Sequence, residues 1–253
     1  MGNRLDGKTA LVTGATSNIG RAIAVSFAAE GAHVAVSGRD RERGEAVTRE
    51  IAARGGRAEF VPATLDGSRA ASVALAERAT EALGGRVDVL VNAAGIYPGS
   101  ITSATDEATF DEVYGVNVKA PYFLTAALAP AMAQRGDGAI INLGSWIARL
   151  GIPVGSLYSS TKGAIETLTR AWAAEFGPSG VRVNAISPGV VRPDPADPGP
   201  GAPMMRGTPA GTVGTPDAVA HAAVYLAGDE ARFVHGTVID VDGGRVGVAV
   251  IAT

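Results

Sequence analysis

Residues 9–31 have the sequence TALVTGATSNIGRAIAVSFAAEG, and this stretch decides the fold. A short run of apolar and β-branched residues comes first, and apolar residues at helical spacing follow from residue 21 onward. The turn between the two parts holds Gly14 and Gly20. Gly14 permits a tight turn, and Gly20 lets the helix pack close to the strand. Many α/β proteins use such a turn only structurally, but its backbone can also approach a phosphate group at the helix N-terminus.

The same order of strand and helix continues along the chain. Runs that favour strands occur at Thr9–Val12, His33–Val36, Ala58–Val61, Val87–Val91, Ala139–Leu143, Arg182–Ile186 and Val238–Val241. Helical patterns lie near 19–30, 41–54, 68–83, 106–134, 156–177 and 215–228. Several strands are apolar throughout, which is typical of a parallel sheet covered on both faces. The sequence therefore predicts an α/β fold of the Rossmann type, a doubly wound parallel sheet of about seven strands with helices on both faces, in a single domain over residues 1–253.

Composition excludes several classes of protein. With 46% apolar and 19% charged residues, the chain has ample material for a core and differs from disordered proteins. The net charge of −3 gives no reason to expect a nucleic-acid partner. The chain has no Cys, and its three His are too far apart for a ligand motif, so we expect no metal. No apolar run reaches the roughly 18 residues of a membrane span, and no signal-peptide core is present, so we expect a cytoplasmic protein without membrane contact.

One segment, residues 192–212, departs from the alternation of strands and helices. Its sequence, RPDPADPGPGAPMMRGTPAGT, holds too much Pro and Gly for a long helix or a central strand. It follows the carboxyl end of an expected strand, where sheets of this kind bind ligands. We expect a substrate lid there, with a plain surface insertion as the alternative.

Four polar residues have a spacing that suits proton transfer. Tyr158 and Lys162 are four residues apart in a helical stretch, so they lie on one helix face. The chain has only five Tyr and three Lys, so such a pair rarely arises by chance. An ammonium beside a phenol stabilises the tyrosinate and lowers its pKa, as a general base requires. Ser145 lies just past the fifth expected strand, and Asn117 lies at an irregular start in the helical stretch 106–134. Taken singly, each residue also has an ordinary structural explanation.

These residues and the turn after the first strand resemble the signatures of the classical short-chain dehydrogenase/reductase family. The resemblance runs from about Lys8 to Gly244 and includes VRVNAISPG at 181–189 and GTVIDVDGG at 236–244. Asn18 replaces the middle glycine of the family's TGxxxGxG turn, and Asn tolerates a left-handed conformation, so we expect the turn to survive. The resemblance implies an enzyme that transfers a hydride between a nicotinamide dinucleotide and a small ketone or secondary alcohol.

The resemblance also implies roles for individual residues. Tyr158 is the acid/base, Lys162 also holds the nicotinamide ribose, Ser145 binds the substrate oxygen, and Asn117 fixes a relay water behind Lys162. The implied dinucleotide contacts are Gly14, Ser17, Asn18, Ile19, Gly20, Arg39, Thr64, Leu65, Asn92, Ala93, Gly95, Tyr158, Lys162, Pro188 and Val191. Two departures weaken this set, because Thr64 replaces an Asp beside the adenine, and Pro193 replaces a Thr near the nicotinamide.

The end of the second strand bears on the choice of dinucleotide. An acidic residue there would bind the ribose hydroxyls of NAD and repel a 2′-phosphate. This chain has Ser37 and Gly38 at that place, followed by Arg39, which can pair with the phosphate. We therefore expect NADP(H), with NAD(H) as the alternative. The competing interpretation is that Arg39 and Arg41 only decorate the first turn of a surface helix.

Sequence neighbours of the reacting residues predict a mostly apolar substrate pocket. The predicted substrate-binding residues are Ser145, Trp146, Tyr158, Tyr97, Met204 and Met205. Arg149, Arg192 and Arg206 are expected to be solvated loop charges. The predicted substrate is therefore a neutral and fairly hydrophobic ketone or secondary alcohol, without a phosphate or carboxylate.

Two rival functions and one assembly state remain to be tested. A dinucleotide-binding sensor or scaffold of the same fold is disfavoured by the intact set of four polar residues. An epimerase or dehydratase of the family's extended branch, which has its glycine at the place of Ser17, is disfavoured because no larger C-terminal domain is present. The resemblance, the apolar helices at 106–134 and 156–177, and the apolar tail at 246–252 predict a homotetramer.

Overall fold

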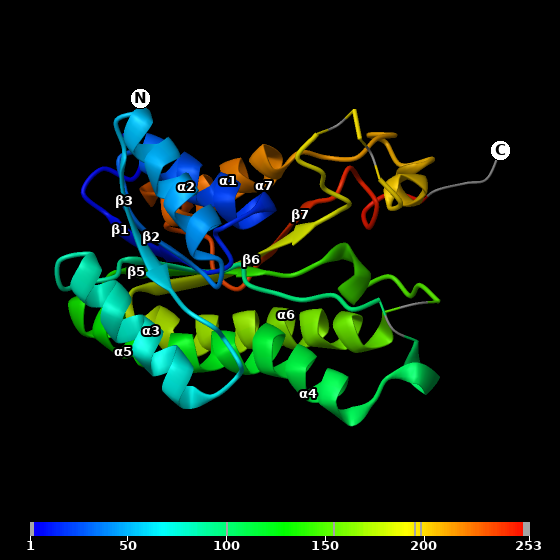
Figure 1. Cartoon of the computed structure of the whole chain (residues 1–253), viewed down its shortest axis with the longest axis horizontal. Helices are drawn as coiled ribbons and strands as arrows, with labels where there is room; N and C mark the ends of the chain where they lie inside the picture. The colour runs from blue at the N-terminus through cyan, green and yellow to red at the C-terminus, as the bar shows by residue number, and fades with distance from the viewer. Residues whose placement is uncertain (1–2, 100, 154, 195, 198, 250–253) are drawn as a thin grey trace.

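The structure is a computed structural model, and it describes residues 3–99, 101–153, 155–194, 196–197 and 199–249. Within these residues the centre of the fold is a seven-stranded sheet in which each neighbouring pair is parallel (Figure 1). The strand order is β3-β2-β1-β4-β5-β6-β7. The strands are β1 (Thr9–Val12), β2 (His33–Gly38), β3 (Arg57–Pro62), β4 (Val89–Asn92), β5 (Gly138–Leu143), β6 (Val181–Pro188) and β7 (Val238–Val241). This sheet confirms the predicted fold class.

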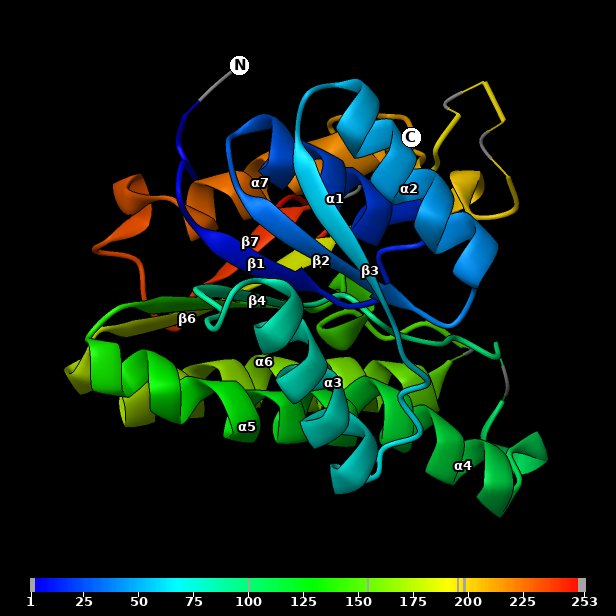
Figure 2. The ribbon, with the colours of Figure 1, turned by 60° about the vertical axis from the view of Figure 1, so that its left-hand side comes forward.

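Helices cover both faces of the sheet (Figure 2). One face carries α1 (Asn18–Ala29), α2 (Arg41–Ala53) and α7 (Pro216–Ala227). The other face carries α3 (Arg69–Ala82), α4 (Glu107–Tyr114), α5 (Ala120–Arg135) and α6 (Ser156–Phe176). No helix in the described part of the chain is both long and apolar enough to cross a membrane.

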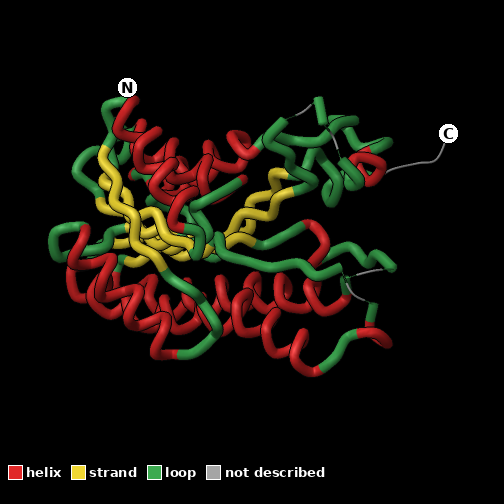
Figure 3. The backbone as a smooth tube through the Cα atoms, viewed as in Figure 1, coloured by secondary structure: helices red, strands yellow, loops and turns green. Residues whose placement is uncertain are grey.

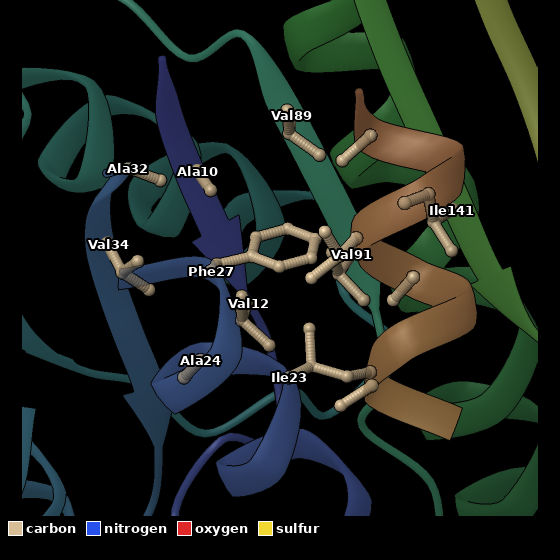
Figure 4. Close-up of a cluster of buried hydrophobic side chains, with 14 of the residues drawn as sticks. Ala10, Val12, Ile23, Ala24, Phe27, Ala32, Val34, Val89, Val91 and Ile141 are labelled. Atoms are coloured by element: carbon tan, nitrogen blue, oxygen red, sulfur yellow. The ribbon is translucent and has the colours of Figure 1, made fainter. Parts of the chain in front are cut away.

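The central strands are apolar throughout because each of their faces meets a helical layer. Val12 of β1 and Val91 of β4 pack with Phe27 of α1 in the core beneath α1 and α7 (Figure 4). Their neighbours Leu11 and Leu90 point the other way, into the core beneath α3, α5 and α6. Successive residues of a strand face opposite sides, so a strand buried on both sides needs apolar residues at every position. The two cores together fix the sheet between its helices.

The helical stretch predicted near 106–134 is confirmed, and the irregularity expected at Asn117 is a π-helical turn at Gly115–Lys119 that joins α4 to α5. The chain passes closely at this turn: a Cβ on Gly115 would lie 2.9 Å from the carbonyl oxygen of Asp66. A π turn places one extra residue in the helix, and such turns are frequent at functional sites. Helical periodicity alone does not show this extra residue.

The direction of strand addition reverses between β1 and β4, because β2 and β3 extend the sheet on one side of β1 and the later strands extend it on the other. Open α/β sheets bind ligands outside the carboxyl ends of the strands at such a switch point. Figure 3 shows the long loops gathered at one end of the sheet. The fold therefore directs attention to the loops that follow β1, β4, β5 and β6.

Candidate active site

A cavity of about 710 Å³ lies at the carboxyl ends of the strands, where the direction of strand addition reverses. Its volume falls within the range of about 300–1,000 Å³ that is typical of small-molecule and cofactor sites. The residues on its wall are Gly14, Thr16, Ser17, Asn18, Ile19, Gly20, Ser37, Gly38, Arg39, Asp40, Arg43, Ala63, Leu65, Ala93, Ala94, Gly95, Ile96, Tyr97, Val116, Leu143, Gly144, Ser145, Tyr158, Lys162, Pro188, Gly189 and Val191. Most residues predicted from the motifs are therefore brought together.

The glycine-rich turn has the conformation that the sequence predicts. Gly14 has a φ of 63°, and Asn18 has a φ of 45°, so both adopt the left-handed region. A Cβ on Gly20 would overlap the carbonyl oxygen of Gly14, which explains why the helix can start so close to the strand. Helix α1 begins at Asn18, and the side chain of its N-cap Ser17 makes no capping hydrogen bond in the described structure. The first N–H groups of α1 therefore remain available to an anion in the cavity.

Thr13 ties this turn to the loop that follows β4. Its hydroxyl donates to the carbonyl of Val91 over 3.2 Å and accepts from the N–H groups of Ala93 and Ala94, each over 3.1 Å. The predicted contact Asn92 lies elsewhere, because its amide donates to Asn142 Oδ1 over 2.9 Å in the neighbouring strand. Asn92 therefore fixes β4 against β5 and does not reach the cavity wall.

The far end of the cavity from α6 carries the basic residues. Gly38 lies under Thr16: a Cβ at Gly38 would lie 2.5 Å from Thr16 Cγ2. Arg39 lines the cavity. Arg41 does not line it, and instead pairs with Glu45 over 3.2 Å on the surface of α2. The structure therefore separates the two arginines that the sequence could not distinguish.

Two further residues near this end were not predicted, and one predicted residue is absent from the wall. Asp40 caps α2, accepting from the backbone N–H of Arg43 over 3.0 Å and from Arg43 Nε over 2.6 Å. Those bonds hold the pKa of the Asp40 carboxyl below its usual value, with the backbone bond as the largest cause. Leu65 lies on the wall as predicted, whereas Thr64 does not.

Tyr158, Lys162 and Ser145 lie together on the wall opposite the basic end. The Lys162 Nζ lies 5.5 Å from the centroid of the Tyr158 ring and donates to the carbonyl of Leu143 over 2.7 Å. Ser145 lies two residues after the end of β5, and it forms a hydrogen bond with Tyr158. Helix α6 thus presents one face to the end of β5, as the four-residue spacing predicts.

Asn117 does not line the cavity but holds part of its wall. Its Oδ1 accepts from the N–H of Ile96 over 2.9 Å, and its Nδ2 donates to the carbonyl of Ile96 over 3.0 Å. The same Nδ2 is 3.2 Å from the hydroxyl of Thr161 on α6. A Cβ on Gly95 would lie 3.4 Å from Asn117 Oδ1 and 3.7 Å from Lys162 Nζ, so both groups border the same glycine.

Burial shifts both titratable groups away from their charged forms. It raises the pKa of Tyr158 to about 12, although the hydrogen bond from Ser145 acts in the opposite direction. It also lowers the pKa of Lys162 to about 8. The expectation that Lys162 lowers the pKa of Tyr158 is therefore wrong for the protein alone. The physical reason is that burial disfavours the charged tyrosinate more than the Ser145 hydrogen bond favours it, while the ammonium of Lys162 donates to the carbonyl of Leu143.

Three of the predicted substrate-binding residues are not on the cavity wall. Trp146 is buried beneath the turn after Ser145, with the Arg245 guanidinium carbon 5.4 Å from its ring centroid. Met205 is buried against the turn that follows β7, and Met204 is exposed to solvent. Tyr97 does lie on the wall, with its ring centroid 4.8 Å from that of Tyr158.

The segment at 192–212 is attached at both ends to the sheet's loops, although positions 195 and 198 lie outside the described residues. The N–H of Arg192 donates to the carbonyl of Gly214 over 2.9 Å. Near its other end, the N–H of Ala210 donates to the carbonyl of Gly243 over 3.1 Å. The segment begins next to Val191, which lines the cavity. A substrate lid therefore stays a prediction for this segment.

Some wall residues escaped the sequence analysis. Thr16, Ala94 and Gly144 lie inside or beside the recognised motifs, so their place next to these motifs could have predicted them. Val116 lies in the π turn and carries no signal of its own. Groups of His and acidic residues that could hold a metal ion are absent from the described ranges.

Comparison with known proteins agrees with this geometry. Residues 14–245 match the family described as enoyl-(acyl carrier protein) reductase. A solved structure of a short chain dehydrogenase/reductase family protein is 44% identical, with a TM-score of 0.88, and the match covers 97% of this chain and 100% of that one. The chain belongs to the short-chain dehydrogenase/reductase family. It is therefore an oxidoreductase, as the motifs predict.

Two other similar proteins show the range of this dehydrogenase/reductase family. Galactitol 2-dehydrogenase (L-tagatose-forming) of Cereibacter sphaeroides is 38% identical over 253 residues, which cover 95% of this chain and 96% of the relative. The crystal structure of a gluconate 5-dehydrogenase from Burkholderia cenocepacia in complex with NADP and tartrate is 30% identical, with a TM-score of 0.87. That match covers 97% of this chain and 98% of the other.

Proposed function

We propose that this oxidoreductase transfers a hydride between NADP(H) and a neutral, fairly apolar ketone or secondary alcohol. The observation that carries the proposal is the single cavity that joins two features. One end holds the glycine-rich turn and the open N-terminus of α1, and the other holds Ser145, Tyr158 and Lys162. A helix N-terminus suits a pyrophosphate, and a phenol beside an ammonium suits proton transfer to a substrate oxygen.

A dinucleotide fits the residues along the wall. Its pyrophosphate is assigned to the turn between Gly14 and Gly20, where a close backbone approach is possible. The adenosine end is assigned to Arg39 and Leu65, and the nicotinamide end to Lys162 and the stretch 188–191, with Gly95 and Ala93 between them. The similar gluconate 5-dehydrogenase binds NADP, which supports this choice of cofactor. NAD is the alternative.

The bound nicotinamide supplies the redox step, accepting a hydride during oxidation and giving one during reduction. Tyr158 takes the hydroxyl proton of an alcohol or gives a proton to a carbonyl oxygen. Because its pKa is about 12, Tyr158 is protonated at neutral pH, which is the form that reduction requires. Ser145 donates a hydrogen bond to the same substrate oxygen and steadies the charge that develops on it.

Lys162 and Asn117 have supporting roles in this proposal. Lys162 holds the nicotinamide ribose with an ammonium that is almost fully buried, at 5% exposure. Asn117 keeps the loop of Ile96 beside α6 and is assigned the relay water behind Lys162. Both side chains border Gly95, so a water there would be within reach of a proton relay.

The wall near Tyr158 supports a neutral substrate. Ile96, Tyr97, Val116 and Val191 surround this end with apolar surface. On the described wall, the charged side chains other than Lys162 are at the adenosine end. A carboxylate or phosphate on the substrate would therefore find no counter-charge there besides Lys162, which is assigned to the nicotinamide ribose.

A linear polyol is the second candidate substrate, because the similar galactitol 2-dehydrogenase acts on one and the hydroxyls of Tyr97 and Ser145 can bind additional oxygens. We expect a spectrophotometric screen of nicotinamide oxidation and reduction to show the highest kcat/KM with cyclic or branched ketones and their alcohols. Higher values with linear polyols would favour the second candidate. Turnover of anionic substrates alone would contradict a neutral pocket, and any turnover excludes a mere sensor or scaffold.

Replacing Arg39 with Asp is expected to lower kcat/KM with NADPH by about 10- to 100-fold relative to NADH. A hydrogen bond to a charged group contributes about 1.5–3 kcal/mol, and the new carboxylate adds repulsion. The matched control is Arg41→Asp, since Arg41 lies two residues after Arg39, at the start of α2, but outside the cavity. Steady-state kinetics with both cofactors measure the effect. An equal shift in the two variants, or an unmutated protein that uses both cofactors equally, would contradict Arg39 as the selector.

The proposal also includes a cytoplasmic homotetramer. Phe110 of α4 and Tyr122 of α5 are each 47% exposed, which leaves aromatic surface on these helices for another copy. The apolar tail at 246–252 lies partly outside the described residues. Light scattering at micromolar concentration is expected to give the mass of four chains. The mass of a single chain would contradict the assembly while leaving the catalytic proposal intact.

A further inference from the structure

The turn that carries Ser145 ends at an ionic cluster outside the cavity. Arg149 lies four residues after Ser145, and its guanidinium forms two hydrogen bonds with Asp240 of β7. The bond from Nη1 to Oδ2 is 3.0 Å long. Its Nε also lies 3.5 Å from Oε1 of Glu166 on α6. One side chain thus joins the turn to a strand and to the helix that carries Tyr158.

Other contacts hold the start and the middle of this turn. The N–H of Gly144 donates to the carbonyl of Ile186 over 2.8 Å, and the hydroxyl of Ser159 donates to the carbonyl of Ile147 over 2.5 Å. Within the turn, the Ser145 hydroxyl accepts from the N–H of Ile147 over a long 3.4 Å. The turn holds the Ser145 carbonyl through the N–H of Ala148 over 2.9 Å but restrains the hydroxyl only weakly, so the place of the hydroxyl also depends on what the turn is attached to.

Electrostatics favour the ionic cluster in which Arg149 pairs with Asp240 and Glu166. Glu166 lies beneath the turn. A Cβ added at Gly144 would lie 3.4 Å from the Oε1 of Glu166. This oxygen is buried and has no hydrogen-bond partner within the described structure. Burial raises the pKa of Glu166, while Arg149 and then Arg170 lower it. Without Arg149, a buried carboxylate would lose its nearest counter-charge directly under the residue that precedes Ser145.

We propose that Arg149 is a positioning residue for Ser145, and that its bridge to Asp240 and Glu166 holds the serine hydroxyl in place beside Tyr158. The inference rests on the proposed function, which assigns Ser145 the substrate oxygen. Arg149 itself is absent from the cavity wall and touches neither substrate nor dinucleotide in this assignment. The ion pairs of Arg149 also differ from the expectation that its side chain is only a solvated loop charge.

Arg149→Met is the test, because Met keeps much of the volume and removes the charge. We expect kcat to fall by about 10- to 100-fold, since a displacement of about 1 Å in an active site can cost on the order of 100-fold. The dissociation constant for NADP(H), followed by nicotinamide fluorescence, is expected to stay the same. In a Ser145→Ala background the same change is expected to have no further effect on kcat, because Arg149 acts through Ser145. An equal fall in both backgrounds, or an unchanged kcat, would overturn the proposal.

Arg135→Met is the matched control for loss of an ion pair. The Arg135 side chain is 33% exposed and faces Asp88, which is 8% exposed, whereas Arg149 is 32% exposed and faces Glu166, which is also 8% exposed. Arg135 lies at the opposite end of the sheet from the cavity, beside Val87. We expect the control to lower the melting temperature as Arg149→Met does but to keep kcat. A similar fall of kcat in the control would show general loosening and overturn the positioning role.

Asp240→Asn gives a second route if Arg149→Met fails to fold, because it removes the charge of one partner without changing its shape. It is expected to lower kcat in the same direction and, again, only when Ser145 is present. Its failure to do so would count against the bridge. Activity of the unmutated protein distinguishes a failure of the proposed function from a failure of the role proposed for Arg149. If it turns over no ketone or alcohol, the proposed function falls and this inference with it; if it does, the Arg149 variants alone decide.

Discussion

Replacing Tyr158 with Phe is expected to lower kcat by about 10²- to 10⁴-fold, the usual contribution of a general acid or base. The change removes only the hydroxyl, so the ring that packs 4.8 Å from the ring of Tyr97 remains. Binding of NADP(H) is expected to stay nearly the same, because the assigned dinucleotide contacts are kept. Steady-state kinetics and a fluorescence titration of the cofactor measure the two effects separately.

Tyr114→Phe is the control for Tyr158→Phe. Tyr114 is 3.0 Å from the hydroxyl of Ser160 on α6, two residues from Tyr158, but it does not line the cavity. This control therefore removes a phenol that contacts the same helix and is expected to keep full activity. Full activity in Tyr158→Phe would contradict the proposed mechanism.

Replacing Lys162 with Met is expected to lower both kcat and the affinity for NADP(H). One buried ammonium is assigned to the nicotinamide ribose and to the proton relay beside Tyr158, so its removal affects binding and proton transfer together. A hydrogen bond to a charged group contributes about 1.5–3 kcal/mol, so we expect about a 10- to 100-fold weaker affinity and at least as large a fall in kcat. A fall in only one of the two quantities would contradict the dual role.

The pH dependence of cofactor affinity gives an independent check on Lys162. Burial lowers its pKa to about 8, so its charge is present below pH 8 and is lost as the pH rises through that value. The dissociation constant for NADP(H) is therefore expected to rise above about pH 8 in the unmutated protein and to stay flat in Lys162→Met. Lys8→Met serves as the control, since Lys8 pairs with Asp137 away from the cavity wall. It is expected to keep the pH dependence.

The sequence predicts the fold well because the fold depends on local patterns. Strands β1 and β7 have the predicted bounds, and the other strands differ at their ends by one or two residues. Apolar residues at every position of a strand have one common explanation, burial on both faces. The sequence indicates an irregular start at Asn117 but not its π-helical form at Gly115–Lys119, where the chain also passes close to the loop at Asp66, a contact between distant parts of the chain.

The difference between local patterns and contacts of distant residues also explains which expectations for the site were right and which were wrong. Gly14, Asn18 and Gly20 lie where predicted because the turn's geometry is set within a few residues. Trp146 and Met205 are sequence neighbours of predicted site residues, but both side chains are buried away from the cavity wall. Trp146 lies beside Arg245, and Met205 lies against the turn after β7. Which way a loop residue faces depends on such distant partners, so a single sequence carries little information about it. The raised pKa of Tyr158 was missed for a related reason, since burial follows from the whole fold.

The contact between Gly38 and Thr16 limits how cofactor preference can change by mutation. An acidic side chain at position 38 is the simplest way to favour NAD, but its Cβ would lie 2.5 Å from Thr16 Cγ2. With Gly38→Asp introduced first, the new Cβ overlaps the Thr16 side chain, which belongs to the phosphate-binding turn. Thr16→Gly introduced first clears the space, after which the same Asp has room. The two changes are therefore not interchangeable in order, and an evolving or engineered lineage can reach an NAD-dependent enzyme along one of the two paths without passing through an intermediate in which these side chains overlap.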